Sequence, residues 1–159
     1  MNVDLSECRP YKDFGRGFYL TSIKGQAEVW AKRTSRIFSG KPWITIFEFD
    51  NAYLTEATLR VKMFNAPNGE WAAFVLNNRN RNFTDFADYN SNHDNKYDIV
   101  AGAVANDDIA LQLRLFTSGV IDIDALVKNM EYRELSDQYS FHTEKAVSYL
   151  IKTGAQCYE

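Results

Sequence analysis

Residues 13–21 constrain this chain more than any other stretch, because two glycines stand directly before a run of bulky residues. Gly15 and Gly17 flank a single residue and can adopt backbone conformations closed to other residues, or let a ligand approach the main chain. The run that follows, residues 18–21, is aromatic and β-branched enough to begin a strand. We therefore expect a tight turn that delivers Tyr19 onto a strand at a fixed place. As a bare pattern, a glycine hairpin carrying a core tyrosine is commoner than a ligand site.

The bulk composition is that of one soluble globular domain spanning residues 1–159. Apolar residues make up 45% of the chain and charged residues 25%, which is ordinary for this class. The net charge of -3 gives no basic field that would attract nucleic acid, although it leaves room for a local patch.

The sequence predicts a cytoplasmic protein. Cys8 and Cys157 could form one disulfide, but two cysteines are no disulfide framework, so a reduced intracellular protein is the better expectation. No apolar run approaches the length of a membrane span, and the first residues are too polar for a signal peptide.

Hydrophobic spacing predicts helices and strands in mixed order, without a regular βαβ alternation. A helix capped by Thr21 or Ser22 should run to about residue 38. Further helices are expected at residues 70–78, at 122–130 after the cap residue Asp122, and from 143 until Gly154 ends the helix. Strands are expected at residues 43–49, 59–64, 97–104 and 137–142. Part of the strand at 43–49 should be buried on both sides. Residues 107–118 fit either a helix or a strand.

Residues 77–95 form the most polar part of the chain and are expected to be either a functional loop or a solvated insertion. Arg79 and Arg81 could meet the phosphates of a dinucleotide, or they could face water. His93 stands beside Asp94 but has no second His or Cys nearby, so no metal site is expected there.

A resemblance to a known family rests first on the residues around the two glycines. Residues 14–20 resemble the motif of the poly(ADP-ribose) polymerases in which a tyrosine stacks on the nicotinamide of NAD. Residues 13–21 are more closely similar to a family of bacterial domains of unknown function that is grouped with the ADP-ribosyltransferases. Later landmarks of that family follow in order over nearly the whole chain: Glu70-Trp71, Phe74-Val75, Asn78-Arg79, residues 97–100, Gly102, residues 105–107, Gln138 and residues 140–146.

The resemblance implies an α+β fold of the ADP-ribosyltransferase type. In that fold two small, mostly antiparallel sheets pack face to face with flanking helices, and NAD lies in the cleft between the sheets. It also implies an NAD-dependent mono-ADP-ribosyltransferase of a toxin or defence system, acting on an unknown macromolecular acceptor. The alternatives are a catalytically inactive module of the same fold that binds a protein, such as a small partner or antitoxin, and a hydrolase that releases free ADP-ribose.

The resemblance also assigns roles to individual residues. Tyr19 would stack on the nicotinamide, and Gln138 would stand where the family places its last catalytic residue. The amide of Gln138 brings no full negative charge to the ribose cation, which favours transfer of one ADP-ribose over chain elongation. The residues expected to bind NAD are Gly15, Gly17, Phe18, Tyr19, Thr21, Gln26, Trp30 and Phe141. For Trp30 the more ordinary expectation is a buried side chain that packs its helix onto the sheet, and Phe141 would ordinarily be a core residue.

One position of the family pattern has no counterpart in this sequence. The family carries a His on an early strand before the glycine unit, but none of the eighteen residues before Tyr19 is a His. His93 and His142 both follow Tyr19, so chain order excludes them from this position. Arg9 is the early cationic residue that could stand in. The chain is therefore expected to begin after the first strand of the family.

Overall fold

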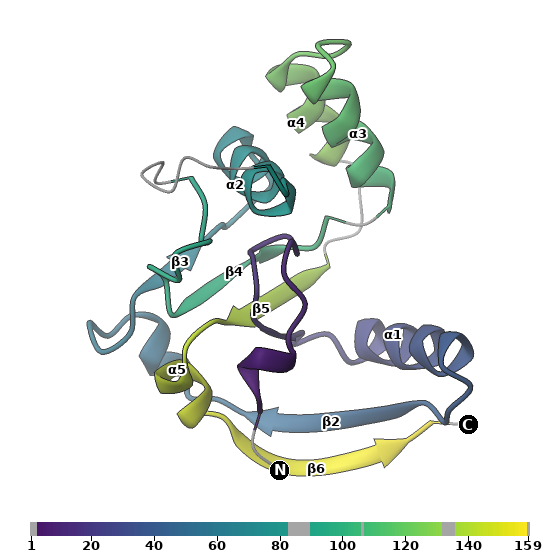
Figure 1. Ribbon diagram of the computed structural model, residues 1–159, viewed down its shortest axis with the longest axis vertical. Coiled ribbons are helices and arrows are strands. Elements are labelled where there is room, and N and C mark those ends of the chain that lie inside the picture. The colour runs from purple at the N-terminus through teal and green to yellow at the C-terminus, as the bar shows by residue number, and fades with distance from the viewer. Residues whose placement is uncertain (1–2, 83–89, 106, 132–135, 159) are drawn as a thin grey trace.

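The computed structural model describes residues 3–82, 90–105, 107–131 and 136–158, and these form an α+β fold with two small sheets (Figure 1). The four-stranded sheet has the order β1-β5-β4-β3, and the two-stranded sheet pairs β2 with β6. The strands are β1 (Phe18–Leu20), β2 (Trp43–Glu48), β3 (Val61–Met63), β4 (Ile99–Ala103), β5 (Asp137–Phe141) and β6 (Ile151–Cys157). The helices are α1 (Lys24–Ile37), α2 (Gly69–Arg79), α3 (Asp107–Thr117), α4 (Ile123–Glu131) and α5 (Glu144–Ser148), with short 3-10 turns at Leu5–Glu7 and Asn51–Leu54. The expectation of an α+β protein with two small sheets and helices is confirmed.

The register of the larger sheet decides which side chains share a face. β5 lies antiparallel between β1 and β4, with Ser140 opposite Tyr19 on one side and opposite Val100 on the other. Because successive side chains of a strand point to opposite faces, Tyr19, Gln138 and Ser140 lie on one face. Phe18 and Phe141 belong to the other face. Only β3 breaks the antiparallel pattern of this sheet, since it pairs with β4 in parallel.

Two separate cores cover the two faces of this sheet. The first joins α2, α3 and α4 to the face that carries Tyr19; its buried members are Phe14, Phe64, Trp71, Ala72, Phe74, Val75, Val100, Ala105, Ile109, Leu113 and Leu126. The second covers the opposite face; its buried members are Leu59, Ile99, Phe141 and Ala146. Figure 1 shows the matching arrangement, with α2, α3 and α4 on one side of the sheet and α5, β2 and β6 on the other. The ambiguity at residues 107–118 is resolved as a helix, because α3 buries Ile109 and Leu113 on one face.

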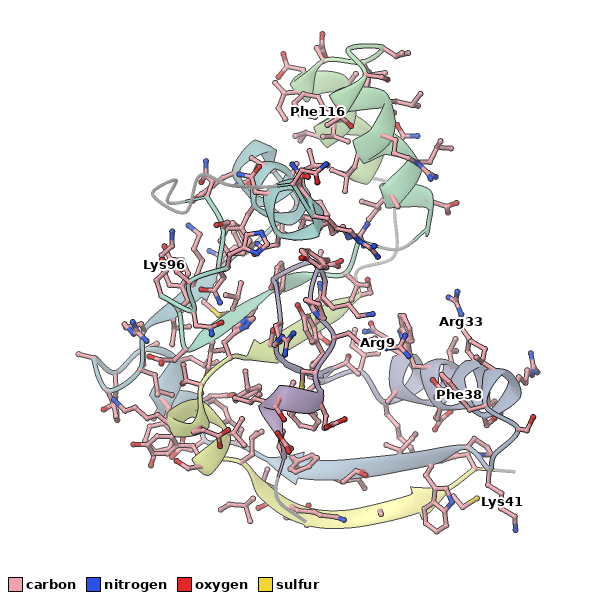
Figure 2. All side chains as sticks on the ribbon, in the orientation of Figure 1. Arg9, Arg33, Phe38, Lys41, Lys96 and Phe116 are labelled. Carbon is pink, nitrogen blue, oxygen red and sulfur yellow. The ribbon has the colours of Figure 1, made fainter. Side chains whose placement is uncertain are left out.

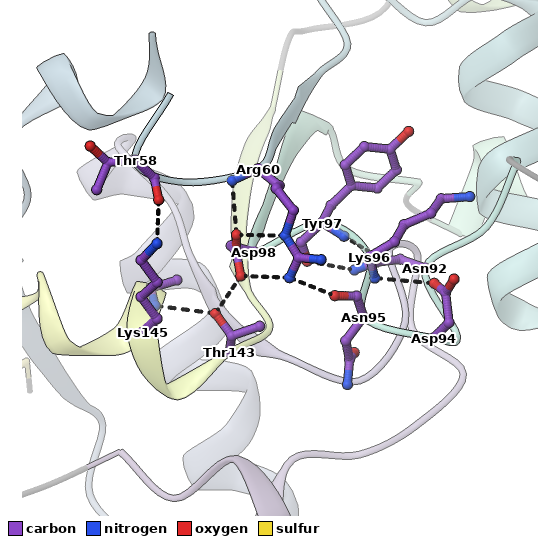
Figure 3. Close-up of polar contacts among 11 residues, drawn as sticks. Thr58, Arg60, Asn92, Asp94, Asn95, Lys96, Tyr97, Asp98, Thr143 and Lys145 are labelled. Carbon is purple, nitrogen blue, oxygen red and sulfur yellow. Dashed lines mark hydrogen bonds and ion pairs between the residues drawn. The ribbon is translucent and has the colours of Figure 1, made fainter. Parts of the chain in front are cut away.

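A buried carboxylate ties three elements of this fold together (Figure 3). Asp98, just before β4, accepts hydrogen bonds from the backbone and the guanidinium of Arg60 and from the hydroxyl of Thr143. Thr143 also caps α5 by accepting a hydrogen bond from the backbone of Ala146. Burial alone would raise the pKa of Asp98, but the hydrogen bonds from Arg60 and Thr143 outweigh it and lower the pKa to about 2. The ionised carboxylate of Asp98 therefore links the starts of β3, β4 and α5 through hydrogen bonds.

The lobe formed by α1, β2 and β6 differs from the rest of the molecule, because none of its residues is fully buried. Trp30 of α1 is 50% exposed, so the expectation that it packs the helix onto the sheet as a buried residue is wrong. The expectation that the strand at 43–49 is buried on both sides is also wrong. The side chains that should have been covered face an open cavity, which is described below.

The predicted helix from residue 143 to Gly154 is wrong in its second half. α5 ends at Ser148, and Ile151–Cys157 form β6, which pairs antiparallel with β2. In the described part of the chain β2 has no other strand partner, so this pairing satisfies its backbone hydrogen-bonding groups. The long-range pairing outweighs the helical spacing of the local sequence.

No helix in the described ranges is long and apolar enough to cross a membrane. Of the polar segment 77–95, the first residues complete α2, and residues 83–89 lie outside the described residues.

Candidate functional site

The two glycines of the opening turn are required by the backbone. Gly15 has a φ of +93°, a conformation that favours glycine, and its N–H closes a turn onto the carbonyl of Lys12 at 3.0 Å. A Cβ on Gly17 would lie 2.6 Å from the Ser140 hydroxyl oxygen and 2.9 Å from the Phe141 carbonyl oxygen. Gly15 therefore permits the turn, and Gly17 lets the chain lie directly against β5.

Tyr19 holds this turn with its hydroxyl group. The hydroxyl donates to the carbonyl of Gly15 at 2.8 Å and accepts from the backbone N–H of Phe14 at 3.0 Å. Burial raises the pKa of Tyr19 above its ordinary value, so the phenol stays protonated near neutral pH. The hydroxyl is therefore committed to the loop, and the ring is the part of Tyr19 that a ligand can use.

Asp13 is the centre of a hydrogen-bond network that the sequence did not reveal. Its carboxylate accepts from Arg79 Nε and Nη2 at 2.9 and 2.6 Å, from the Ala105 N–H at 2.9 Å and from Gln138 Nε2 at 2.8 Å. Arg79 also donates to the carbonyl of Ala105 at 2.8 Å. Asp13 is 6% exposed, so the network fixes the turn, α2 and β5 around a nearly buried carboxylate, while the side chain of its partner Arg79 is 31% exposed.

The same network fixes the orientation of the Gln138 amide. Its nitrogen donates to Asp13 at 2.8 Å and to the carbonyl of Ala103 at 3.2 Å. Because both of these partners are acceptors, the amide nitrogen must point towards them. Among the described residues none donates to the side-chain oxygen of Gln138, which leaves this oxygen as the acceptor available to a ligand.

A second set of contacts anchors the start of α1 beside Gln138. Gln26 donates its amide to the carbonyl of Asp137 at 2.7 Å, and its buried side-chain oxygen has no hydrogen-bond partner within the described ranges. Thr21 and Ser22 donate their hydroxyls to the Asp137 carboxylate. The prediction that Thr21 or Ser22 caps α1 is wrong, since the cap position is Ile23, which makes no side-chain cap bond.

One cavity of about 1580 Å³ joins the two residues expected to be catalytic. Tyr19 and Gln138 both line it, although they lie far apart in the sequence. Of the other residues expected to bind NAD, four also line this cavity: Phe18, Thr21, Gln26 and Trp30. Gly15 and Gly17 are not among its lining residues, and Phe141 is buried in the second core, on the opposite face of the sheet.

The charged groups around the cavity are mainly cationic. Six basic residues line it: Arg9, Lys12, Lys24, Arg33, Lys41 and Arg79. The one acidic residue in its lining, Asp13, is paired with Arg79. An anionic group of a ligand would therefore be favoured in this cavity.

Ser140 and His142 form a buried pair behind Tyr19. One ring nitrogen of His142, Nδ1, lies 2.7 Å from the carbonyl of Arg16, so it carries the proton and donates it there. Nε2 then accepts from the Ser140 hydroxyl at 2.8 Å. Burial is the main reason that the pKa of His142 is lowered to about 4, and the hydrogen bond to Arg16 and the charge of Asp98 oppose it. His142 is therefore a neutral structural link.

The stability of the protein should depend on pH through His142. The pKa is about 4 in the folded protein and 6.5 for an ordinary His, so the unfolded chain binds more protons between these values. The free energy of unfolding should therefore fall as the pH falls through this window, by about 2 kcal/mol from pH 7 to pH 5. Urea unfolding at the two pH values measures this loss. The variant His142→Asn should be less stable at pH 7 but show a smaller loss between the two values, and an unchanged loss in the variant would exclude His142 as its source.

Comparison with known proteins identifies a family but no characterised relative. A family model described as "Protein of unknown function (DUF3990)" matches residues 1–151. No curated protein and no solved structure matches the chain.

Proposed function

The chain belongs to the DUF3990 family, and from the arrangement of its cavity we propose that it is an NAD-dependent mono-ADP-ribosyltransferase with a macromolecular acceptor. The observation that carries the proposal is that Tyr19 and Gln138 line the same cavity. Ser140 is the cross-strand partner of Tyr19, and Gln138 stands two residues before Ser140 on β5, so Gln138 and Tyr19 are diagonal neighbours on one face. Diagonal neighbours on one face of a sheet stand about 7–8 Å apart, a separation that suits two contacts with one small ligand.

The reaction requires little covalent chemistry from the protein. The bond between nicotinamide and C1′ of the ribose breaks, and its electron pair leaves with the nicotinamide. The ribose becomes oxocarbenium-like, and an acceptor nucleophile forms a new bond to C1′ and releases its proton to solvent. The protein assists by holding nicotinamide in place and by putting a hydrogen-bond acceptor near the ribose hydroxyls.

The two residues divide this work. The ring of Tyr19 stacks on the nicotinamide, while its hydroxyl stays bound to the turn. The side-chain oxygen of Gln138 accepts a hydrogen bond from a ribose hydroxyl, because both of its amide hydrogens are already donated to Asp13 and Ala103. The unpartnered oxygen of Gln26 gives the cavity wall a further acceptor, which suits the carboxamide N–H of nicotinamide. An acceptor without full charge at Gln138 favours transfer of a single ADP-ribose.

Other features support the proposal less specifically. The α+β architecture with two small sheets agrees with an ADP-ribosyltransferase-like fold, but would not select it alone. The diphosphate of NAD is anionic, and Arg9 and Lys12 line the same cavity as Tyr19. Arg9 is also the residue that we propose in place of the early His of related families.

A thermal-shift titration with NAD tests the proposal. A ligand that binds only the folded state stabilises it by about 2.7 kcal/mol when its concentration is one hundred times its dissociation constant. For a chain of this length that corresponds to a rise of roughly 5–10 °C in Tm. The variant Gln112→Ala, on α3 outside the cavity, should show the same rise as the unchanged protein. An unchanged Tm at millimolar NAD would contradict the proposal.

A second candidate function is an inactive module of the same fold that binds a protein partner, such as an antitoxin. The observation that favours it is the exposure of the large apolar residues Trp30, Phe38 and Trp43. The two functions are separated by the release of free nicotinamide when the protein is incubated with NAD and a cell extract that supplies the macromolecular acceptor. A transferase releases it, and the inactive module does not.

A further inference from the structure

The cavity has a charge opposite to that of the chain as a whole. The chain carries a net charge of -3, yet six basic residues and one acidic residue line the cavity. The acidic residue, Asp13, is neutralised by its ion pair with Arg79. Within the described residues, Arg9, Lys12 and Lys41 form no ion pair, so their charges are not cancelled by a neighbour. A cationic cavity in an acidic protein indicates an anionic ligand.

Aromatic rings stand exposed among these charges. Trp30 is 50% exposed, Phe38 64% and Trp43 59%, and all three line the cavity. The guanidinium of Arg33 lies 5.6 Å from the centre of the Trp30 ring. Figure 2 shows Arg9, Arg33 and Phe38 around α1, and Lys41 on the segment that leads into β2. Alternating cations and open aromatic faces are the pattern with which proteins hold unpaired bases and their phosphates.

The cavity is also larger than one dinucleotide needs. Sites for small ligands occupy about 300–1000 Å³, and this cavity measures about 1580 Å³. It begins beside Gln138, where Gln26 is anchored, and continues along α1 to Phe38 and Lys41. With a rise of 1.5 Å per residue, the part of α1 from Gln26 to Ile37 covers about 17 Å. This length leaves room for a second ligand beyond the Tyr19 end.

We propose that this cavity binds a single-stranded nucleic acid. Its phosphates lie against Arg9, Lys12, Arg33 and Lys41, and its unpaired bases stack on Trp30, Phe38 and Trp43. The exposed rings favour a single strand over a duplex, because the faces of paired bases are not open to stacking. They also favour it over an acidic protein, whose carboxylates would use the cations and leave the rings unoccupied.

The further step, that this strand is also the acceptor of ADP-ribose, rests on the proposed transferase function. In that reaction a ring nitrogen or hydroxyl of the strand forms the bond to ribose C1′ as the bond to nicotinamide breaks, and the proton of the attacking group passes to solvent. Binding of the strand itself requires no NAD. The two proposals can therefore fail separately.

Fluorescence anisotropy with 5′-labelled twelve-nucleotide strands of dT and of rU tests the binding in the absence of NAD, and comparison of the two strands distinguishes DNA from RNA. We expect micromolar dissociation constants in 100 mM salt for at least one strand, and weaker binding of the matching duplex. With four phosphate contacts, a plot of log K against log salt concentration should have a slope of about −2.8.

Variants locate the surface. Arg33→Glu combined with Lys41→Glu should weaken binding at least tenfold, whereas Arg114→Glu combined with Lys128→Glu makes the same change of charge on α3 and α4, outside the cavity, and should have little effect. Trp30→Ala should weaken binding about tenfold, because one stacked base is lost, and should leave the salt slope unchanged. Trp30 is half exposed, so this variant is expected to fold.

Three results would overturn the inference. The first is that neither strand binds at 100 μM protein in 50 mM salt. The second is that the two double variants weaken binding equally. The third is that a polyglutamate of equal charge competes with the labelled strand as well as the unlabelled strand does. The last result would assign the cavity to an acidic protein. Nicotinamide release, measured after NAD is added to the same samples, reports on the transferase separately.

Discussion

Asp13→Asn should lower the free energy of unfolding by about 3–5 kcal/mol, because it removes a nearly buried carboxylate that pairs with Arg79 and accepts two further hydrogen bonds. The carboxylate of Asp13 accepts from Arg79, Ala105 and Gln138, and an asparagine would present N–H groups to donors that need an acceptor. The charge of Arg79 would remain without its partner. For a chain of this length we expect Tm to fall by roughly 6–20 °C.

The stability of Asp13→Asn, measured by chemical denaturation, is best compared with the stability of Asp124→Asn. Asp124 lies exposed in the first turn of α4, so the same change there should alter stability by no more than about 0.5 kcal/mol. A double-mutant cycle with Arg79→Met isolates the pair, and the double variant should lose less stability than the sum of the single variants. A loss below about 1 kcal/mol in Asp13→Asn would contradict the structural role of the network.

Gln138→Ala should reduce the rate of nicotinamide release from NAD about 10²–10³-fold, the usual effect of removing one group that stabilises a developing charge. Two hydrogen bonds of the amide nitrogen fix the direction of the Gln138 side-chain oxygen, so the substitution removes an acceptor held in a defined place. The expected effect is on kcat more than on KM, because the contact with the ribose strengthens as the cation forms.

Two controls separate this chemical effect from a loss of folding. Gln112→Ala removes the same group from α3, where Gln112 bonds to Asn129, and should release nicotinamide at the unchanged rate. The fraction of folded Gln138→Ala should be measured by circular dichroism at the assay temperature. Full activity in Gln138→Ala would exclude the role proposed for this residue.

Local sequence patterns were sufficient where an element packs on the core beside it. α2 was expected from Trp71, Phe74 and Val75, and all three are buried on the face that packs against the sheet. The start of α4 was expected from Asp122, whose side chain accepts from the N–H of Ala125 at 2.8 Å. In both cases the apolar spacing and the capping residue agree with the tertiary structure.

The same reasoning failed where the partner of an element lies far away in the chain. Ile151–Cys157 have no alternation of apolar and polar residues, and become a strand because β2 pairs with them. The apolar face of α1 was expected to be covered, but its residues line a cavity instead. A pattern of apolar residues indicates a face, and does not show whether protein or ligand covers it.

The candidate site was predictable only in part. Tyr19 and Gln138 were identified from a resemblance, and they line one cavity. Asp13 was seen only as the first residue of a motif, because its partners Arg79 and Gln138 are 66 and 125 residues away in the sequence. No local spacing connects such residues, so the role of Asp13 could be found only in the folded chain.

The central claim is that the ring of Tyr19 and the amide of Gln138 hold the nicotinamide of NAD in one cavity. Saturation-transfer difference NMR with NAD tests it most directly, because it shows which protons of a weakly bound ligand contact the protein. The account predicts stronger transfer to the nicotinamide protons than to the adenine protons, retained in Tyr19→Phe and lost in Tyr19→Leu. No transfer, or equal nicotinamide signals in Tyr19→Phe and Tyr19→Leu, would contradict it.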